Sequence, residues 1–419
     1  MSSVSQRPVS KRSSASLFYM LAIGTGVMRT LSVVFDVVAI NTIQINPLIY
    51  GFLAQWVSFL VTVTLVAFVS IRQTVDGRRQ SLGYNLDPDF DRLRMLPKKP
   101  MLYLMASGFF AGISTLSYYI LTGAADASAV LPYGQLVIVY LLMGDLLAEK
   151  DTPTIIEIQS IISILFGVLL IGATPVGFDI SSLLIVLGPM NISAAFVTYY
   201  QRKTKRYEVR PGLRVDSLNM RVWSLLVLNS VMTVLIIPLM PADSLQVMID
   251  NFIPLFWMMV GSSVTIFLAL VMYARALGKG SMSVVNSLSA ISVVLGVPIT
   301  LIGNIFIPNG FGIIETDPFM WILTILGIIL VMIGILALQA ADVRSIVLVK
   351  VKPMVGDILP ELFDIKGVEN AAALAGTQDY LLAIKSRNLT KTRTKILSKI
   401  YLIPGIDNIE TLVVIREYK

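Results

Sequence analysis

Two charged side chains stand inside the first apolar stretch of the chain. Arg29 lies near its centre, and Asp36 follows seven residues later, on the same helical face but about 10 Å further along the axis. A charge at mid-bilayer costs about 2.5 to 3.5 kcal/mol on insertion scales, so both should face a polar interior. Arg29 could bind a substrate carboxylate or phosphate, and Asp36 could take up a proton or bind an amine. A buried structural pair that fixes this helix is the alternative.

Other polar residues within apolar stretches are weaker candidates for a solute site, because Ser, Asn and Gln also join helices by hydrogen bonds. The further candidates for substrate binding or coupling are Gln55, Tyr119, Tyr133, Gln135, Asn191, Tyr199, Asn286 and Ser289. Proline and glycine are expected to interrupt three of the helices. Such breaks leave backbone carbonyl groups free to bind a solute, or they act as hinges. These hinge candidates are Pro132, Gly188, Pro189, Gly296 and Pro298.

The elements that must position these residues are apolar segments long enough to cross a membrane. Hydrophobic residues make up 55% of the chain and charged residues only 14%, whereas about a quarter of a soluble protein is charged. A spanning helix needs about 20 mostly apolar residues. We predict ten such helices, the first a retained span and not a cleaved signal peptide, near residues 15–38, 47–71, 101–123, 127–147, 154–174, 180–201, 220–240, 252–275, 281–307 and 318–340.

Basic residues fall on alternate joints between these segments, which predicts their orientation. The joints after helices 1, 3, 5, 7 and 9 contain no lysine or arginine. The positive-inside rule therefore predicts a multi-pass protein of the cell membrane with both termini in the cytoplasm, and it explains the net charge of +7 without nucleic acid as a partner. The basic residues of the other joints include Arg72, Arg78, Arg79, Arg92, Arg94, Lys98, Lys99, Lys150, Arg202, Lys203, Lys205, Arg206, Arg210, Arg214, Arg221, Arg275 and Lys279.

Cysteine and histidine are both absent from the chain. This excludes a disulfide framework, a thiolate or imidazole metal site, a cysteine nucleophile and a Ser-His-Asp triad. We therefore expect no enzyme activity, no cofactor and no metal. A carboxylate-only calcium or magnesium site is the remaining alternative, but Asp87, Asp89 and Asp91 lie between arginines and lack the glycine and glutamate of a calcium loop.

A weak internal repeat relates the two halves of the apolar region. Sliding the chain by 154 residues aligns residues 116–147 with residues 270–301 and superposes Tyr119 on Tyr273. The match places helices 3 and 4 on helices 8 and 9, which implies two repeats of five spans. An odd number of spans inverts one repeat relative to the other, an architecture common among secondary carriers.

The segments that carry this repeat resemble a known family. Residues 273–290 followed by 293–303 look like the eighth-to-ninth-helix signature of the drug/metabolite transporter superfamily, EamA-like branch, and residues 119–151 look like its helix 3 to helix 4 segment. Glu149 falls where the family carries a Gly-Glu pair, although Ala148 replaces the glycine. The resemblance covers about residues 15–340 and implies transport of amino acids, drugs or other metabolites.

After Ala340 the chain alternates apolar and charged residues like a small soluble domain. We predict strands at 345–352, 369–375, 380–386 and 409–416, with helices at 356–363 and 389–401. The order βαββαβ predicts a ferredoxin-like sandwich. One sheet face would remain bare, which favours pairing with a second copy.

This tail resembles the effector-binding domain of the Lrp/AsnC family of amino-acid-responsive regulators. Residues 347–352, 367–369, 376–380 and 403–412 match its pattern in order and spacing. The resemblance implies a homodimer and an amino-acid pocket to which the loop of Gly376, Thr377, Gln378 and Asp379 contributes. Gln378 stands where an aromatic residue is more usual, and no helix-turn-helix precedes the domain.

Together these features predict an all-α polytopic membrane protein of ten helices in two inverted five-helix repeats, followed by an α+β ferredoxin-like domain. The predicted parts are a cytoplasmic N-terminal tail (1–14), the two repeats (15–174 and 175–340) and the cytoplasmic domain (341–419). The leading hypothesis is an exporter of amino acids or similar metabolites whose tail senses an amino acid and dimerises. The alternatives are a membrane receptor without transport, and a transporter whose tail only dimerises it.

Overall fold

The computed structural model describes residues 11–75, 78–122, 131–149, 155–171, 173–174, 177–178, 180–210, 213–279, 282–311, 317–340, 343–353, 356–363, 365, 368–386 and 396–413. The chain divides into two compact units, one of Met1–Asp145 with Ile162–Ile335 and the other of Leu146–Ile161 with Leu336–Lys419. The predicted N-terminal tail falls mostly outside the described residues.

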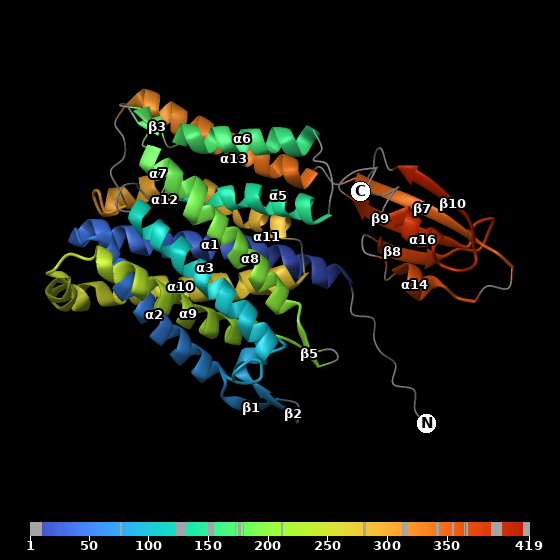
Figure 1. The fold of residues 1–419 in the computed structure, drawn as a ribbon, viewed down its shortest axis with the longest axis horizontal. Helices are drawn as coiled ribbons and strands as arrows, with labels where there is room; N and C mark the ends of the chain where they lie inside the picture. The colour runs from blue at the N-terminus through green and yellow to red at the C-terminus, as the bar shows by residue number, and fades with distance from the viewer. Residues whose placement is uncertain are drawn as a thin grey trace. The chain divides into compact units, whose positions relative to one another are not determined.

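Helices make up nearly all of the chain before the tail (Figure 1). They are α1 (Lys11–Ile43), α2 (Pro47–Val69), α3 (Lys98–Thr122), α5 (Val137–Glu149), α6 (Ile155–Ile171), α7 (Ile180–Ile185), α8 (Asn191–Lys205), α9 (Ser217–Ile236), α10 (Ser244–Lys279), α11 (Met282–Ser289), α12 (Ile291–Phe306) and α13 (Pro318–Ala340).

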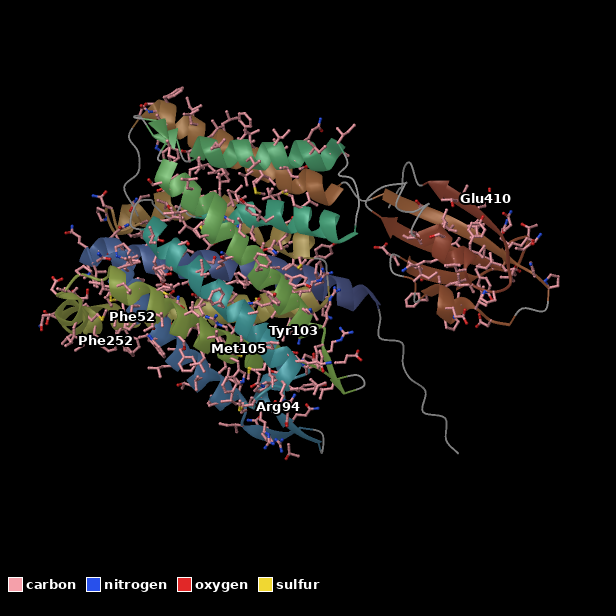
Figure 2. All side chains as sticks on the ribbon, in the orientation of Figure 1. Phe52, Arg94, Tyr103, Met105, Phe252 and Glu410 are labelled. Carbon is pink, nitrogen blue, oxygen red and sulfur yellow. The ribbon has the colours of Figure 1, made fainter. Side chains whose placement is uncertain are left out.

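Among the described residues, eight helical stretches are long and apolar enough to cross a membrane. Two shorter apolar helices, Leu131–Gly144 and Ile158–Ile171, lie where the fourth and fifth spans were predicted. The structure thus supports a polytopic helical body, while the count of ten spans stays a prediction. Large apolar side chains such as Met105 and Phe252 are exposed on the outside of these helices (Figure 2), as lipid contact requires.

Small residues let the helices approach closely. A Cβ atom on Gly26 of α1 would lie 2.2 Å from the carbonyl oxygen of Ser289, and one on Gly51 of α2 would lie 2.6 Å from the Tyr119 ring. Gly167 and Gly327 each present a backbone carbonyl to the other, since a Cβ atom on either would come within 2.6 Å of the partner's oxygen. Such contacts stabilise helix pairs through packing where lipid supplies no hydrophobic drive.

Three apolar segments are interrupted within the larger unit, which is that of Met1–Asp145 with Ile162–Ile335. A short 3-10 turn, η2 (Gly134–Leu136), precedes α5, and a π-helical turn, η3 (Val186–Met190), joins α7 to α8. Gly188 has φ −94° and ψ −106°, outside the helical range, and Pro189 follows it. The helix is therefore broken at the position where the sequence predicts a break. The third interruption lies at Ala290, between α11 and α12.

The expectation that Gly296 and Pro298 interrupt this last helix is wrong. Helix α12 continues through Pro298, which costs only the hydrogen bond that the Pro298 nitrogen would have donated. The Gly296 carbonyl accepts a second bond from the Thr300 hydroxyl at 3.0 Å. Membrane helices tolerate a proline where neighbouring groups satisfy the freed backbone atoms.

The ends of α2, α3, α8, α9 and α10 that lie near the basic loops form one side of the larger unit, which we call the basic side. It carries the hairpins β1 (Arg72–Val75) with β2 (Arg78–Ser81) and β5 (Glu208–Arg210) with β6 (Leu213–Arg214). Arg221, counted above among the loop residues, instead lies inside α9 and is 8% exposed. Its charge is therefore not a solvated topology signal.

The tail forms a four-stranded antiparallel sheet of β7 (Val343–Val351), β8 (Val368–Ala373), β9 (Tyr380–Ser386) and β10 (Ile406–Val413), in the order β10-β7-β9-β8. Helices α14 (Leu359–Phe363) and α16 (Ser398–Tyr401) supply Leu362 and Ile400 to a core with Val347 and Leu382. This is the predicted βαββαβ order, with strand ends shifted by up to three residues. The first part of the predicted second helix falls outside the described residues.

Candidate functional site

The side chain of Arg29 is exposed although the residues around it are buried. Its Nη2 atom lies 3.6 Å from the point where a Cβ atom on Gly134 would stand, and the Met190 Cε lies 3.9 Å from the same point. Its charge also acts on Tyr273 of α10. Arg29 makes no hydrogen bond or ion pair with any residue that the structure describes, so its guanidinium donors are free for a ligand.

The elements around Arg29 are held together by side-chain amides. Asn191, at the start of α8, donates to the carbonyl oxygens of Tyr133 at 2.9 Å and Val186 at 2.8 Å, so it ties the two broken turns to each other. Its own Oδ1 atom is buried without a partner among the described residues. Gln135 donates to the hydroxyl of Ser292 on α12 at 3.2 Å.

A second set of contacts crosses from α8 to α10 and α11. The hydroxyls of Thr198 and Tyr273 lie 2.8 Å apart, and the amide of Asn286 donates to Tyr273 at 2.9 Å. We call these groups together the Arg29 cluster. Its members are Arg29, Tyr133, Gln135, Asn191, Thr198, Tyr273, Asn286 and Ser292.

Asp36 occupies a different environment, which we call the Asp36 cluster. Its Oδ1 atom accepts hydrogen bonds from Tyr50 of α2 and Ser262 of α10, each at 2.8 Å, and its Oδ2 atom accepts one from Tyr118 of α3 at 3.2 Å. The Ser262 hydroxyl also lies 2.9 Å from that of Ser32. Asp36 is only 5% exposed, and no cation pairs with it among the described residues.

The structure separates the two charged candidates. Arg29 and Asp36 form no ion pair, which argues against their being a structural pair and agrees with the spacing along α1. Gln55 donates to the Tyr119 hydroxyl at 3.3 Å, and the Tyr119 ring lies against Tyr50, so these two candidates border the Asp36 cluster. A carboxylate enclosed by three hydroxyls is suited to exchanging a proton and is poorly exposed to a solute amine.

Two predicted residues lie outside both clusters. Tyr199 is 46% exposed and stands beside Tyr200 and Lys203 on the surface. The Ser289 hydroxyl donates to the Asn286 carbonyl of its own helix at 2.8 Å. Conversely, the hydroxyl donors to Asp36 were missed, because a tyrosine or serine in an apolar segment gives no signal by itself. Tyr273 was visible only as a match in the internal repeat.

The predicted effector loop of the tail is partly fixed by its own backbone. Asp379 accepts a hydrogen bond from the Val351 nitrogen at 2.8 Å and donates from its nitrogen to the Val349 carbonyl at 3.0 Å. Its carboxylate therefore closes the loop against β7. Gly376 and Thr377 are exposed, and the side-chain oxygen of Gln378 is buried without a partner among the described residues.

The three aspartates of the alternative calcium or magnesium site form ion pairs with basic side chains of the protein. Asp87 and Asp89 both bind Lys205, and Asp91 pairs with Arg72 at 2.8 Å. Among the residues that the structure covers, no group of three or more Asp, Glu, Cys or His side chains could hold a metal ion. The carboxylates already have cations as partners.

Comparisons with known proteins bear mainly on the tail. A comparison with curated proteins finds no match. One solved structure, titled "Crystal structure of protein", is 14% identical, covers 78% of this chain and 96% of its own, and has a TM-score of 0.45. Residues 344–419 match the family model of the Lrp/AsnC ligand binding domain, and the C-terminal part of the chain is identified as such a domain.

Proposed function

We propose that the chain is a secondary transporter of the drug/metabolite type that exports amino acids or similar small metabolites. Its Lrp/AsnC domain would sense an amino acid and adjust transport. The observation that carries the first part is the Asp36 cluster, a carboxylate buried between α1, α2, α3 and α10 that has no cation partner in the part of the chain that the structure describes. Such a charge is costly within a membrane and marks proton relays and ion pathways.

The division of roles follows from the two environments. Arg29, exposed and without a hydrogen-bond or ion-pair partner among the described residues, would bind the carboxylate of the solute through charge-assisted hydrogen bonds. Asp36, enclosed by hydroxyls, would carry the coupled proton. Protonation turns one carboxylate oxygen into a donor, so at least one of the three hydroxyls must reorient. Because Ser262 belongs to α10 and Asp36 to α1, this rearrangement would change a contact between the two repeats.

The broken helices support the inverted-repeat architecture. A shift of 154 residues maps Gln135 and Leu136 onto Ser289 and Ala290, and a helix is interrupted at both places. Discontinuous helices at matched positions of two repeats are typical of carriers that bind solute near the midplane. In this proposal the chain lies in the cell membrane with both termini and the tail in the cytoplasm.

The test of transport is flux in proteoliposomes. In the presence of a pH gradient, purified protein should accelerate the movement of at least one radiolabelled amino acid across the membrane. The references are protein-free liposomes and liposomes with heat-denatured protein. A panel of anionic, zwitterionic and cationic amino acids identifies the solute class, and Arg29 favours the first two. Absence of protein-dependent flux over the panel would support the receptor alternative instead.

Ligand binding by the tail is proposed from its family and from Gln378. The buried side-chain oxygen of Gln378, which has no partner among the described residues, is an acceptor that an amino-acid ammonium could use. We expect isothermal titration of the full-length protein in detergent to detect an amino acid, and Gln378→Ala to weaken its binding by about tenfold, the value of one charge-assisted hydrogen bond. Thr377→Ala, at an exposed neighbouring position, is the matched control. Equal affinities in all three proteins would remove Gln378 from the site.

Pairing of two copies through the tail is proposed from the bare sheet face. The register places Ile346 between Leu412 and Ala383, and Leu348 between Glu410 and Leu381, all on the face opposite the helices. Leu412 is 46% exposed. An apolar face of this kind in a soluble domain fits a second copy of the same sheet. If transport does not respond to any ligand of the tail, pairing is the role that remains.

A further inference from the structure

Lys205, the last residue of α8, is a lysine whose ammonium group is withdrawn from solvent. The residue is 5% exposed, and its Nζ atom lies 2.8 Å from Asp87 Oδ2 and 3.1 Å from Asp89 Oδ2. Its aliphatic stem lies on α10, where a Cβ atom on Gly278 would stand 3.1 Å from the Lys205 Cγ. Lysine side chains are rarely buried, because the ammonium group loses its hydration. A buried lysine therefore requires a negatively charged partner that compensates for this loss.

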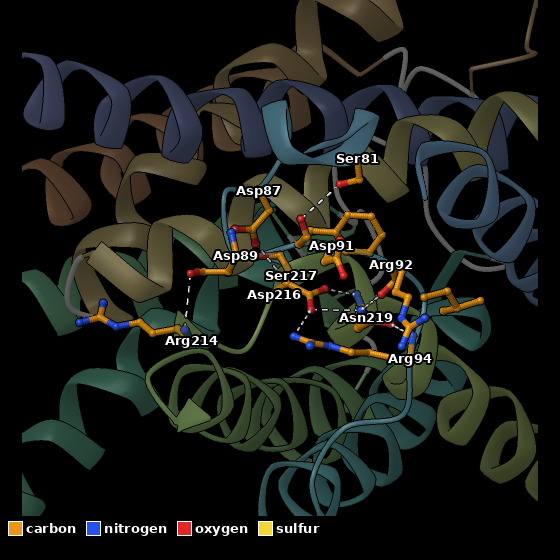
Figure 3. A network of polar contacts seen from close by, with 12 residues as sticks. Ser81, Asp87, Asp89, Asp91, Arg92, Arg94, Arg214, Asp216, Ser217 and Asn219 are labelled. Atoms are coloured by element: carbon orange, nitrogen blue, oxygen red, sulfur yellow. Dashed lines mark hydrogen bonds and ion pairs between the residues drawn. The ribbon is translucent and has the colours of Figure 1, made fainter. Parts of the chain in front are cut away.

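Asp87 is such a partner, because it is buried and binds two elements at once. It is 1% exposed, and the oxygen that binds Lys205 also accepts a hydrogen bond from the Ser217 nitrogen at 2.7 Å, at the start of α9. Figure 3 shows Asp87 next to Ser217. Burial raises the pKa of this carboxyl, but the Lys205 charge and the hydrogen bonds from Lys205 and Ser217 outweigh burial and leave the pKa below its usual value. Asp87 is therefore ionised at neutral pH.

The loop that carries Asp87 and Asp89 is anchored to α9 independently of Lys205. Asn219 accepts a hydrogen bond from the Arg94 nitrogen and donates to the Arg92 carbonyl, each at 2.9 Å (Figure 3). Trp223 donates to the Arg94 carbonyl at 2.9 Å. The two aspartates are thus presented to α8 by a fixed support, and releasing Lys205 would leave that support in place.

The other end of α8 starts at the broken turn. Gly188 has non-helical backbone angles, Pro189 follows, and within the described ranges no heavy atom lies within 4 Å of a Cβ atom placed on Gly188. Helix α8 has 15 residues. It begins just after the break at Gly188 and Pro189 and ends at Lys205, which makes the two ion contacts. It contributes Asn191 and Thr198 to the Arg29 cluster.

We propose that Lys205, Asp87 and Asp89 form a latch that closes the basic side of the larger unit, and that α8 swings about Gly188 and Pro189 when the latch opens. This deepens the proposed function: release of the latch would move Thr198 away from Tyr273 and open the Arg29 cluster to the side that the positive-inside rule places in the cytoplasm. Hydration of the three charged groups in the open state would offset part of the loss of their contacts.

The test uses a reporter cysteine, which the cysteine-free chain makes specific. Thr198→Cys replaces a residue that is 3% exposed, and its reaction with a water-soluble thiol reagent is timed in purified full-length protein. In the Lys205→Gln background we expect labelling to be about tenfold faster, because the neutral side chain loses both ion contacts. Lys205→Arg keeps the charge and should stay within about threefold of the parent rate.

The matched control is Arg72→Gln, which breaks the ion pair with Asp91 on the same loop. Those side chains are 49% and 50% exposed, so this pair contributes little and the labelling rate should not change. If Lys205→Gln lacks a thermal unfolding transition, Asp89→Asn replaces it, since that change removes one of the two ion contacts and Asp89 is 25% exposed. A labelling rate that is equal in the Lys205→Gln (or Asp89→Asn) variant and the parent would overturn the latch.

The labelling result does not depend on transport. Faster labelling in Lys205→Gln with no flux in any protein would support the latch and reject the proposed function. Unchanged labelling in a protein that transports would do the reverse. Equally fast labelling in Lys205→Gln and Lys205→Arg would show that the contact acts by packing on Gly278 and not by charge, which also rejects the latch.

Discussion

Replacing Asp36 with asparagine is expected to abolish transport driven by a pH gradient while leaving exchange of labelled for unlabelled solute intact. The amide cannot release a proton, so the variant resembles the permanently protonated state. We expect gradient-driven flux to fall by about a hundredfold or more, because a buried carboxylate of this kind would carry the coupled proton. Exchange needs the solute-bound protein to reorient but no net proton movement, and it should fall by less than about threefold.

The two assays together separate coupling from folding. A variant that only damages the bundle would lose gradient-driven flux and exchange in parallel. Asp216→Asn is the matched control, because Asp216 is also a fully buried carboxylate, and burial raises its pKa to about 6 against the hydrogen bonds from Asn219. It caps α9 by accepting from the Asn219 nitrogen at 2.7 Å, and asparagine caps a helix as well as aspartate does.

Gradient-driven flux in Asp216→Asn should therefore match that of the parent protein. If Asp36→Asn kept full gradient-driven flux, Asp36 would be excluded as the proton carrier. The enclosure of Asp36 by Tyr50, Tyr118 and Ser262 would then have to be explained as a fixed polar support between helices.

The charges of this site could be predicted from the sequence, but not their partners. Arg29 and Asp36 stand out because an apolar segment rarely tolerates charge. The three hydroxyl donors to Asp36 come from positions 14, 82 and 226 residues away. Tertiary packing of four helices decides which tyrosine or serine faces inward, and such residues are common enough in apolar helices that composition alone cannot single them out.

The wrong predictions of helix bounds and helix breaks have a similar origin. The basic-residue pattern predicts Arg221 on a loop at the edge of the span at 220–240, yet α9 starts at Ser217 and Arg221 is buried within it. Pro298 suggested a break that its helix avoids, while the real break at Ala290 has no proline. Gly26 of α1 approaches the Ser289 carbonyl next to this break, and such a contact between distant helices leaves no local sequence signal.

The tail was predictable because its signal is local. Alternation of apolar and polar residues identified each strand, and a one-residue slip would have turned every core side chain outward. Val347 and Val349 on β7 and Leu382 and Ile384 on β9 are the buried set that this alternation requires. By contrast, the ion contacts of Lys205 join the end of α8 to aspartates 118 and 116 residues away, so the sequence shows Lys205 only as one basic residue among several.

The second large effect is expected for Arg29, where the change tests solute binding. Arg29→Gln removes a guanidinium that has no protein partner among the described residues, so its loss should leave the fold intact. We expect the KM for an anionic or zwitterionic solute to rise by about 10- to 100-fold, the value of charge-assisted hydrogen bonds to a carboxylate. Concentration dependence of exchange in proteoliposomes measures this directly.

Thermal unfolding of the same variant decides between binding and structure. A charge buried for structural reasons has partners, and its removal lowers the unfolding temperature. An unpartnered charge within a membrane segment costs free energy, so Arg29→Gln should unfold at the same temperature as the parent protein or higher. Arg29→Lys keeps the charge but loses the planar fork, and an intermediate KM is expected. A lower unfolding temperature with an unchanged KM would instead assign Arg29 to the structure of α1.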